Sequence, residues 1–238
     1  MASYVGGKGR ICKDIYKAIK KEVKNKPVRG YIEPFCGGLS VIVKFTNEYE
    51  CFAYDYNEDL IYLWEQFKLG NVNKMPEITR DYFTKLKGSD ELSIDKSFAM
   101  LFCTFNCFYR RNFVENHHVI TERLYHQERF NRIKKNIDFS KLNFKCQHYI
   151  DTTHQVLQGG FIIYCDPPYK NTTQQYSTVN NFDSELFWKT VLLWKYLGNY
   201  VFVSELTCPI KHEVLFEKVL QVSVSSHRHT MTDKLFGI

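Results

Sequence analysis

Short apolar runs alternate with stretches of helical periodicity along most of this chain. Apolar runs bounded by turn residues predict buried strands, whereas apolar residues at every third or fourth position predict amphipathic helices. The expected strands are residues 31–34, 51–54, 144–149, 161–165 and 200–204. The expected helices are residues 9–25, a helix that begins near Leu39, residues 58–69 and residues 185–197. A closing hairpin is expected from residues 219–225 and 235–238. This alternation predicts an α/β fold.

The middle of the chain departs from this pattern. Helical segments are expected near residues 95–107 and 124–137, on either side of an irregular stretch at residues 108–112. No glycine occurs between Gly88 and Gly159, so a set of tight hairpins is not expected here. We therefore expect a mostly helical insertion within one domain.

Length and composition limit the class of protein. The 238 residues, with an apolar share of 44%, allow one large domain with a sizeable core. No apolar run approaches the length of a membrane span, and residues 1–8 contain no hydrophobic signal region, so we expect a soluble, intracellular protein. The eight cysteines include no Cys-x-x-Cys pair, which indicates free thiols. Cys103 and Cys107 with His117 and His118 match no common zinc module, so no metal site is predicted.

The net charge of +6 is unevenly spread, and much of the positive surplus lies in residues 85–145. Such a run usually forms a solvated helical surface. Lysines and arginines that neutralise phosphates also supply most of the nonspecific affinity of proteins for DNA. The charge pattern alone leaves both interpretations open.

The sequence Asp166-Pro167-Pro168-Tyr169 follows the expected strand at residues 161–165. It therefore lies at the carboxyl end of a strand, where α/β proteins place their ligands. The two prolines hold the backbone extended and leave their carbonyls unpaired. A carboxylate and a carbonyl can accept the N–H groups of an exocyclic amine while a tyrosine stacks on its ring. The alternative is a proline turn that simply ends a strand.

A second candidate site element is the glycine turn after the first expected strand. Gly37 and Gly38 let the backbone approach a ligand closely. Asp55 ends the next strand, at a separation typical of an acid that accepts ribose hydroxyls. The turn lacks the Gly-x-Gly-x-x-Gly pattern of dinucleotide enzymes. An adenosine-bearing ligand without a diphosphate therefore fits better than a nicotinamide cofactor, and S-adenosylmethionine is the obvious one.

With these motifs in this order, the chain resembles the Dam-like DNA adenine-N6 methyltransferases of the D12 class, alpha group, as found in T-even phages and other viruses. The elements that carry the resemblance are the amino-terminal Gly-x-Lys element at residues 4–8, the cofactor glycine loop at 33–41, the element that packs on the cofactor adenine at 148–151, the catalytic motif at 166–169, and the closing strands at 203–205 and 234–236. The resemblance is weakest from about residue 70 to 145, so it does not predict the recognition sequence. It also does not predict whether a restriction enzyme accompanies the protein.

The resemblance implies a Rossmann-like S-adenosylmethionine-dependent methyltransferase sheet. It assigns residues 1–70 and 143–238 to the catalytic domain and residues 71–142 to an inserted, mostly helical target-recognition region. The implied reaction is site-specific transfer of methyl from S-adenosylmethionine to a flipped-out adenine in duplex DNA, with S-adenosylhomocysteine as product. The implied setting is a monomer or homodimer in the cytoplasm of a bacterial or virus-infected cell. With this resemblance, phosphate contact becomes the favoured interpretation of the basic insertion.

The resemblance also implies roles for individual residues. The expected catalytic residues are Asp166, Pro167, Pro168 and Tyr169. The expected cofactor-binding residues are Tyr4, Lys8, Phe35, Gly37, Gly38, Asp55, Tyr149, Asp151 and Asp166. The expected DNA contacts are Arg110, Arg111 and Lys170. Ordinary core packing for the aromatic residues and a solvated side chain for Lys8 stay as alternatives.

Two other functions fit the same motifs. The first is an N-methyltransferase that acts on RNA adenine or on a protein amide, because the motif serves any planar amine or amide. The second is an inactive homologue that binds DNA or the cofactor without turnover.

Overall fold

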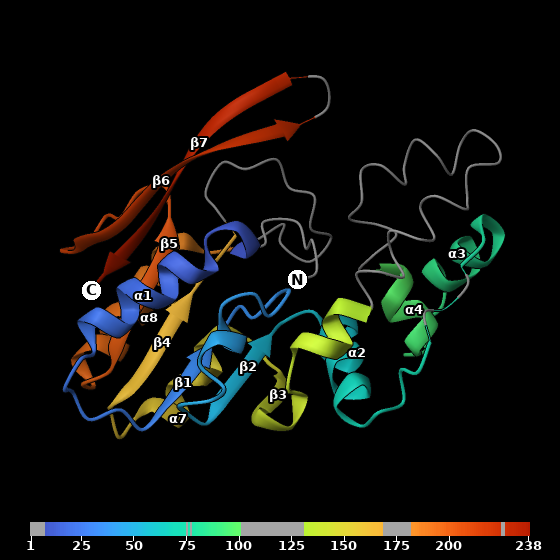
Figure 1. Ribbon diagram of the computed structural model, residues 1–238, viewed down its shortest axis with the longest axis horizontal. Helices are drawn as coiled ribbons and strands as arrows, with labels where there is room; N and C mark the ends of the chain where they lie inside the picture. The colour runs from blue at the N-terminus through green and yellow to red at the C-terminus, as the bar shows by residue number, and fades with distance from the viewer. Residues whose placement is uncertain (1–7, 75, 77, 101–130, 169–181, 225–226) are drawn as a thin grey trace.

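The computed structural model describes residues 8–74, 76, 78–100, 131–168, 182–224 and 227–238. Its core is a seven-stranded sheet with the strand order β3-β2-β1-β4-β5-β7-β6 (Figure 1). The strands are β1 (Gly30–Glu33), β2 (Cys51–Asp55), β3 (Leu142–Cys146), β4 (Phe161–Cys165), β5 (Tyr200–Glu205), β6 (Glu213–Val224) and β7 (His227–Gly237). The helices are α1 (Cys12–Glu22), α2 (Glu58–Lys68), α3 (Arg80–Lys87), α4 (Ile94–Phe98), α7 (Thr152–Val156) and α8 (Ser184–Tyr196). Single 3₁₀ turns are η1 (Lys8–Arg10), η2 (Ile42–Lys44), η4 (Phe139–Lys141) and η5 (Tyr149–Asp151).

The first five strands are parallel, and only β7 runs against its neighbours. The pairs β1–β2, β1–β4, β2–β3 and β4–β5 are parallel, whereas β7 is antiparallel to both β5 and β6. The carboxyl ends of β1 to β5 therefore meet at one edge of the sheet. The winding of the chain reverses between β1 and β4, and such a switch point is where open α/β sheets bind ligands. The predicted α/β fold is confirmed.

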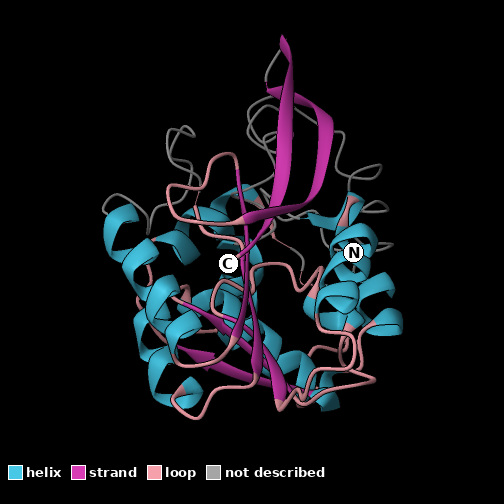
Figure 2. Ribbon diagram, turned by 90° about the vertical axis from the view of Figure 1, so that its left-hand side faces the viewer, coloured by secondary structure: helices cyan, strands magenta, loops and turns pink. Residues whose placement is uncertain are grey.

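Helices cover both faces of this sheet. On one face, α1 and α2 pack on a cluster that includes Tyr31 and Tyr164. On the other, α7 and α8 pack on a cluster that includes Ile32 and Ile163 (Figure 2). Because the central strands are buried on both faces, they read as continuous apolar runs rather than as alternating ones.

Both predicted helices α1 and α2 are present: α2 agrees with its prediction to within one residue, whereas α1 is three residues shorter at each end. Ile11, Ile15 and Ile19 are almost fully buried, as the helical spacing predicts. The side chain of Asn57 caps α2 by accepting a hydrogen bond from the Leu60 amide, 3.2 Å away. The helix ends before Gly70, whose φ of 76° is the left-handed conformation that a helix terminus favours.

The helix expected from Leu39 is wrong. Leu39 has a φ of 58°, which is left-handed backbone and cannot begin a right-handed helix. The segment forms turns that contain only η2. The strand expected at residues 144–149 is also displaced: β3 begins two residues earlier and ends at Cys146. His148 then caps η5 by accepting a hydrogen bond from the Ile150 amide.

The closing hairpin is confirmed and is longer than predicted. Only residues 234–237 of β7 pair with β5, while the rest of the strand pairs with β6 alone. The hairpin therefore projects from the sheet past the carboxyl end of β5 (Figures 1 and 2).

The described parts of the insertion are helical and are anchored on α2. Phe98 from α4 and Ile133 from the helical residues 131–136 join the same apolar cluster as Trp64 and Phe67. Residues 101–130, which contain about half of each expected helix, lie outside the described residues. No helix within the described ranges is long and apolar enough to cross a membrane.

Candidate active site

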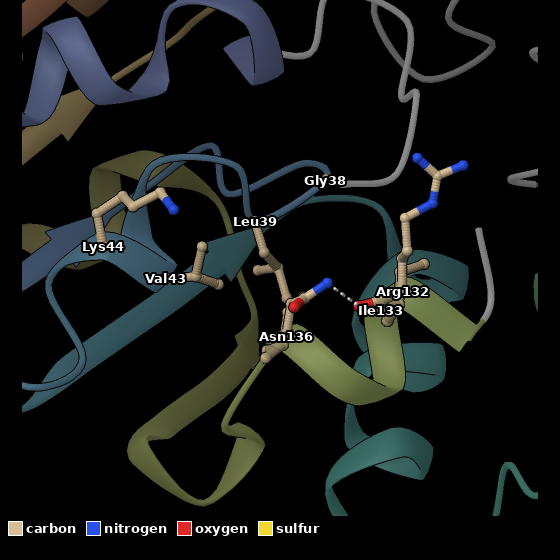
Figure 3. A pocket seen from close by; sticks show the side chains of 8 residues that line it. Gly38, Leu39, Val43, Lys44, Arg132, Ile133 and Asn136 are labelled. Atoms are coloured by element: carbon tan, nitrogen blue, oxygen red, sulfur yellow. Dashed lines mark hydrogen bonds between the residues drawn. The ribbon is translucent and has the colours of Figure 1, made fainter. Parts of the chain in front are cut away.

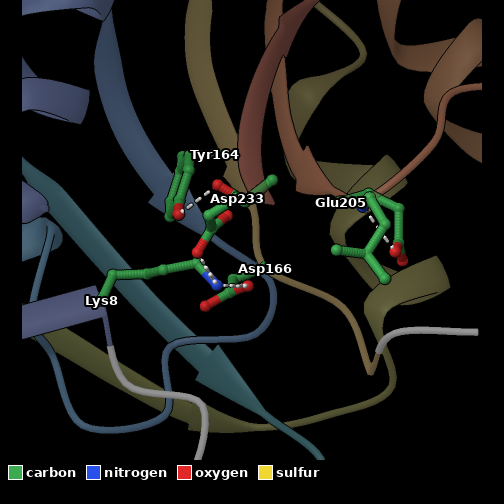
Figure 4. Close-up of polar contacts among 7 residues, drawn as sticks. Lys8, Tyr164, Asp166, Glu205 and Asp233 are labelled. Carbon is green, nitrogen blue, oxygen red and sulfur yellow. Dashed lines mark hydrogen bonds and ion pairs between the residues drawn. The ribbon is translucent and has the colours of Figure 1, made fainter. Parts of the chain in front are cut away.

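Asp166 lies immediately after β4, at the switch point of the sheet. One oxygen of its carboxylate, Oδ1, forms an ion pair with the Lys8 ammonium at 3.0 Å (Figure 4). Burial raises the pKa of Asp166 to about 6, although Lys8 lowers it and the charge of Asp233 raises it further. Pro167 is buried beside it and Pro168 is half-buried. The carboxylate is thus held in place by a fixed cation and keeps 20% of its side chain exposed.

Lys8 lies between two carboxylates. Its ammonium is also 3.2 Å from Oδ2 of Asp233 on β7, and the lysine is only 6% exposed. Burial would lower the pKa of Lys8, but Asp166 and Asp233 outweigh this effect and raise it. Lys8 is therefore not a solvated lysine. Asp233 was not among the residues predicted from the sequence. The available signal was an acidic residue two positions before the apolar pair Leu235–Phe236 of a strand.

A layer of buried polar side chains lies around this ion pair. The Tyr164 hydroxyl and the Ser204 hydroxyl are 2.8 Å apart. Glu33, at the end of β1, accepts a hydrogen bond from the Tyr31 hydroxyl at 2.8 Å. Burial raises the pKa of Glu33 well above its ordinary value, and the nearby Asp166 charge adds to this shift. Burial therefore favours the protonated form of Glu33, whereas Lys8 favours the ionised form of Asp166.

The glycine turn after β1 is tied to the end of β2. Gly37 has a φ of 44°, and its amide donates a hydrogen bond to Oδ2 of Asp55 at 3.1 Å. The amide of Asn57 donates to the other oxygen of Asp55 at 3.0 Å, and the Trp64 indole donates to the Gly37 carbonyl at 3.0 Å. Burial raises the pKa of Asp55 although these amides stabilise its charge. A carboxylate has about four acceptor positions, so Asp55 keeps capacity for the hydroxyls of a ligand.

An aromatic cluster lies beside the glycine turn. Phe35 and Tyr149 contact each other, with ring centroids 5.3 Å apart and an interplanar angle of 31°. Phe182 and Phe187 complete the cluster, each within 6.0 Å of both rings. A base stacked between Phe35 and Tyr149 would need them about 7 Å apart, twice the usual contact distance. A purine would therefore stack on the outside of the cluster or separate these two rings. Asp151 follows Tyr149 and is exposed.

A pocket of about 270 Å³ lies where the glycine loop meets the end of the insertion (Figure 3). Leu39 and Val43 line it on one side and Ile133 on the other, and Lys44, Arg132 and Asn136 add polar groups to its lining. The loop that follows β1 is hydrogen-bonded to Asp55 through its Gly37 amide, and the same loop also contacts the inserted region.

The remaining predicted site residues lie outside the described residues. They are Tyr4, Arg110, Arg111, Tyr169 and Lys170, together with the cysteines and histidines considered for zinc. Within the described ranges, no group of three or more His, Cys, Asp or Glu side chains could hold a metal ion. The structure therefore brings together Lys8, Asp166, the glycine turn, Asp55 and the two aromatic residues.

The fold and this site define a Rossmann-like methyltransferase. Its features are five parallel strands, an antiparallel strand beside β5, and a glycine turn that is hydrogen-bonded to the acidic residue at the end of β2. Residues 4–190 match the family model of the D12 class N6 adenine-specific DNA methyltransferases, and the chain belongs to this family. The protein is therefore a DNA adenine methyltransferase, as the motifs predicted.

Two further similarities concern individual proteins. The chain is similar to the type II methyltransferase M.MjaIII of Methanocaldococcus jannaschii, with 26% identity over 211 residues that cover 76% of this chain and 73% of that protein. Its fold is similar to that of the rRNA methyltransferase aviRa from Streptomyces viridochromogenes, with 9% identity and a TM-score of 0.47, over 100% of this chain and 87% of that one.

Proposed function

We propose that this protein transfers the methyl group of S-adenosylmethionine to N6 of an adenine that has flipped out of duplex DNA. The observation that carries the proposal is the Asp166 carboxylate, held by Lys8 at the end of β4 and directly beside the strand that leads to the glycine turn. A methyl transfer between two bound molecules requires that both be held side by side. A carboxylate that would accept the amine and a glycine turn that would hold the cofactor, on adjacent strand ends, meet this requirement.

Asp166 and the Pro167 carbonyl would activate the amine. Adenine N6 is a poor nucleophile because its lone pair is conjugated into the ring. Acceptance of both N6 hydrogens draws the nitrogen towards tetrahedral geometry and exposes the lone pair. As the N–C bond forms and the S–C bond breaks, sulfur would keep the bonding electrons, and the methylated nitrogen would release one proton to water. The carboxylate stabilises the positive charge that develops on nitrogen.

The base must leave the duplex to reach Asp166, because the amine is otherwise paired. Unstacking and unpairing cost a few kcal/mol, on the order of what one stacking contact and two hydrogen bonds return. Tyr169 is the proposed stacking partner of the flipped base, and Lys170 a proposed contact to the DNA beside it.

The described residues fit S-adenosylmethionine. Asp55 would accept the ribose hydroxyls, because it lies at the end of β2 with spare acceptor capacity. Gly37 and Gly38 would lie under the methionine portion, and the cluster with Phe35 and Tyr149 would contact the adenine. Tyr4 and Asp151 complete the proposed set. Lys8 is assigned to Asp166 rather than to a cofactor carboxylate, because two protein carboxylates already contact it.

We assign DNA reading to residues 71–142, with Arg110 and Arg111 as the proposed base or phosphate contacts. The positive surplus of this region supports duplex DNA as the partner. The similarity to a type II methyltransferase supports methylation of one short sequence within a restriction-modification system. The protein would act inside the cell as a monomer or homodimer.

The test is transfer of a labelled methyl group to defined substrates. Purified protein is incubated with labelled S-adenosylmethionine and duplex DNA, single-stranded RNA or a protein mixture, and the product nucleoside is identified by mass spectrometry. We expect N6-methyladenine in duplex DNA and none with Asp166→Ala. Label in RNA adenine or in a protein amide would replace the proposed substrate. Cofactor binding without transfer to any substrate would mean an inactive homologue.

A further inference from the structure

The Lys8–Asp166 ion pair has a third member that the proposed chemistry does not use. Asp233, near the end of β7, is only 2% exposed, and its Oδ2 lies 3.2 Å from the same ammonium that contacts Asp166 at 3.0 Å. The three groups come from the first described turn of the chain, the end of β4 and the last strand.

One ammonium is thus shared between two carboxylates. Burial of the second carboxylate adds a desolvation penalty to that of the first. A side chain kept at such a cost acts on its neighbours. The titratable groups that face Asp166 and Asp233 from the surrounding elements are Lys8 of η1, Glu33 of β1, and Tyr164 and Cys165 around the end of β4. Among these described groups, Lys8 is the cation.

We propose that Asp233 is a positioning residue for the methyl transfer. Asp233 holds the Lys8 ammonium in a position where the ammonium orients the Asp166 carboxylate and still leaves that carboxylate electron-rich. Shared between two carboxylates, the ammonium fixes Oδ1 of Asp166 without fully neutralising it. The carboxylate then remains a strong acceptor for the target amine. Asp233 itself contacts neither substrate nor cofactor. This inference rests on the proposed role of Asp166.

Two substitutions should move the acidic limb of the pH–rate profile in opposite directions. The limb of kcat/KM reports ionisation of Asp166 in the free enzyme, near pH 6 in the unaltered protein. Lys8→Met removes the cation and should move the limb to higher pH. Asp233→Asn removes a like charge and should move it to lower pH. Asp233→Asn should also lower kcat about 10- to 100-fold above the limb, because the carboxylate is less well oriented. Cofactor affinity and KM for DNA should not change.

Asp14→Asn is the matched control. The Asp14–Lys218 ion pair also joins the amino-terminal segment to the closing hairpin at 3.2 Å, but it is exposed and lies on α1 and β6. If Asp233 only ties the hairpin down, Asp14→Asn should reproduce part of its effect on thermal unfolding, and neither variant should move the limb.

The outcomes separate this inference from the proposed function. No methylation of DNA adenine by the unaltered protein contradicts the proposed function itself. If the unaltered protein methylates DNA adenine but Asp233→Asn has an unmoved acidic limb and an unchanged kcat, only the role of Asp233 is contradicted. A shift of the acidic limb to higher pH in Asp233→Asn would contradict that role as well. If Asp233→Asn does not fold, the double variant Lys8→Met, Asp233→Asn is compared with Lys8→Met. The acidic limb of the double variant should lie at lower pH than that of Lys8→Met. Acidic limbs at the same pH would overturn the inference.

Discussion

At the scale of single residues, two carboxylates on neighbouring strand ends have different partners and therefore different roles. Burial raises the pKa of both Asp166 and Asp55. Asp166 is paired with a lysine, which fixes its orientation and its charge. Asp55 is held by backbone amides of the glycine turn and of its own strand end. This contrast predicts that their substitution separates catalysis from cofactor binding.

Replacement of Asp166 by alanine should abolish turnover and spare the cofactor site. The variant loses the group that accepts the target amine and stabilises its developing charge, so kcat should fall at least about 100-fold. Single-turnover methylation of duplex DNA measures this loss, and calorimetric titration with S-adenosylmethionine measures affinity. Near-normal turnover would contradict the catalytic role of Asp166.

Replacement of Asp55 by alanine should act mainly on cofactor affinity. It removes the proposed ribose acceptor and also releases the Gly37 amide, so the dissociation constant should rise roughly 10- to 100-fold, the range for hydrogen bonds to a charged group. Glu58→Ala is the control, because Glu58 is an exposed acid at the start of α2. Equal affinities for the two variants would remove Asp55 from the cofactor site.

The sequence identified the residues whose position follows from a strand end. Asp55 and Asp166 each close an apolar run, so topology alone places them at one edge of the sheet. Asp233 was not predictable in this way, because it lies within a strand whose partner and register depend on the complete sheet. The direct contact between Phe35 and Tyr149 was also beyond sequence reasoning, since it depends on side-chain packing.

At the scale of elements, helices α2 and α8 are each followed by the same three residues, Leu-Gly-Asn. The two asparagines have different surroundings. Gly70 and Gly198 both have a positive φ, 76° and 83°, as expected after a helix. Asn71 is exposed, and its side chain donates a hydrogen bond to the side chain of Gln66, which is partly exposed. Asn199 is 2% exposed and makes three hydrogen bonds to backbone: it donates to the carbonyls at the ends of α7 and α8, and it accepts from the first amide of β4.

Asn199→Ala should therefore destabilise the protein much more than Asn71→Ala. The first leaves buried backbone groups without partners and should lower the free energy of unfolding by about 3 kcal/mol. The second should change it by less than about 0.5 kcal/mol, as is usual for an exposed site. Urea unfolding followed by tryptophan fluorescence measures both values. Similar losses would show that the buried amide adds little to the junction.

The sequence predicted where these helices end but not which end is buried. Local turn residues mark a terminus, whereas burial depends on the elements that pack over it. The same limit explains the helix wrongly expected from Leu39, where the turn that brings Gly37 to Asp55 overrides the local preference for a helix.

At the scale of the whole molecule, one sheet is built from two separated stretches of chain, with the insertion packed against α2. The glycine turn precedes the insertion and Asp166 follows it, and the division into a catalytic domain and an inserted target-recognition region stays a prediction. The antiparallel placement of β7 between β5 and β6 was not predictable from periodicity, because a hairpin can join a sheet through either of its strands.

Alanine substitution of Arg110 and of Arg111 should show how the insertion reads DNA. An arginine that contacts guanine in the major groove contributes about 1–3 kcal/mol of discrimination at one position, whereas a phosphate contact weakens all sequences alike and makes the salt dependence shallower. Methylation of a randomised duplex library by each variant distinguishes the two. Unchanged sequence preference and DNA affinity in both variants would remove these arginines from the DNA interface.

The placement of Lys8 and Asp233 on the first described turn and the last strand has a consequence for biosynthesis. A ribosome delivers the chain from its amino terminus, and elements can fold as they emerge. The glycine turn and Asp55 can meet once β2 has formed, long before β7 is made. The glycine turn and Asp55, two parts of the proposed cofactor site, are therefore complete earlier in synthesis than the Lys8–Asp233 contact that would orient Asp166. Chains released before β7 is made would lack this contact, so unfinished copies of the enzyme would methylate DNA more slowly than complete ones.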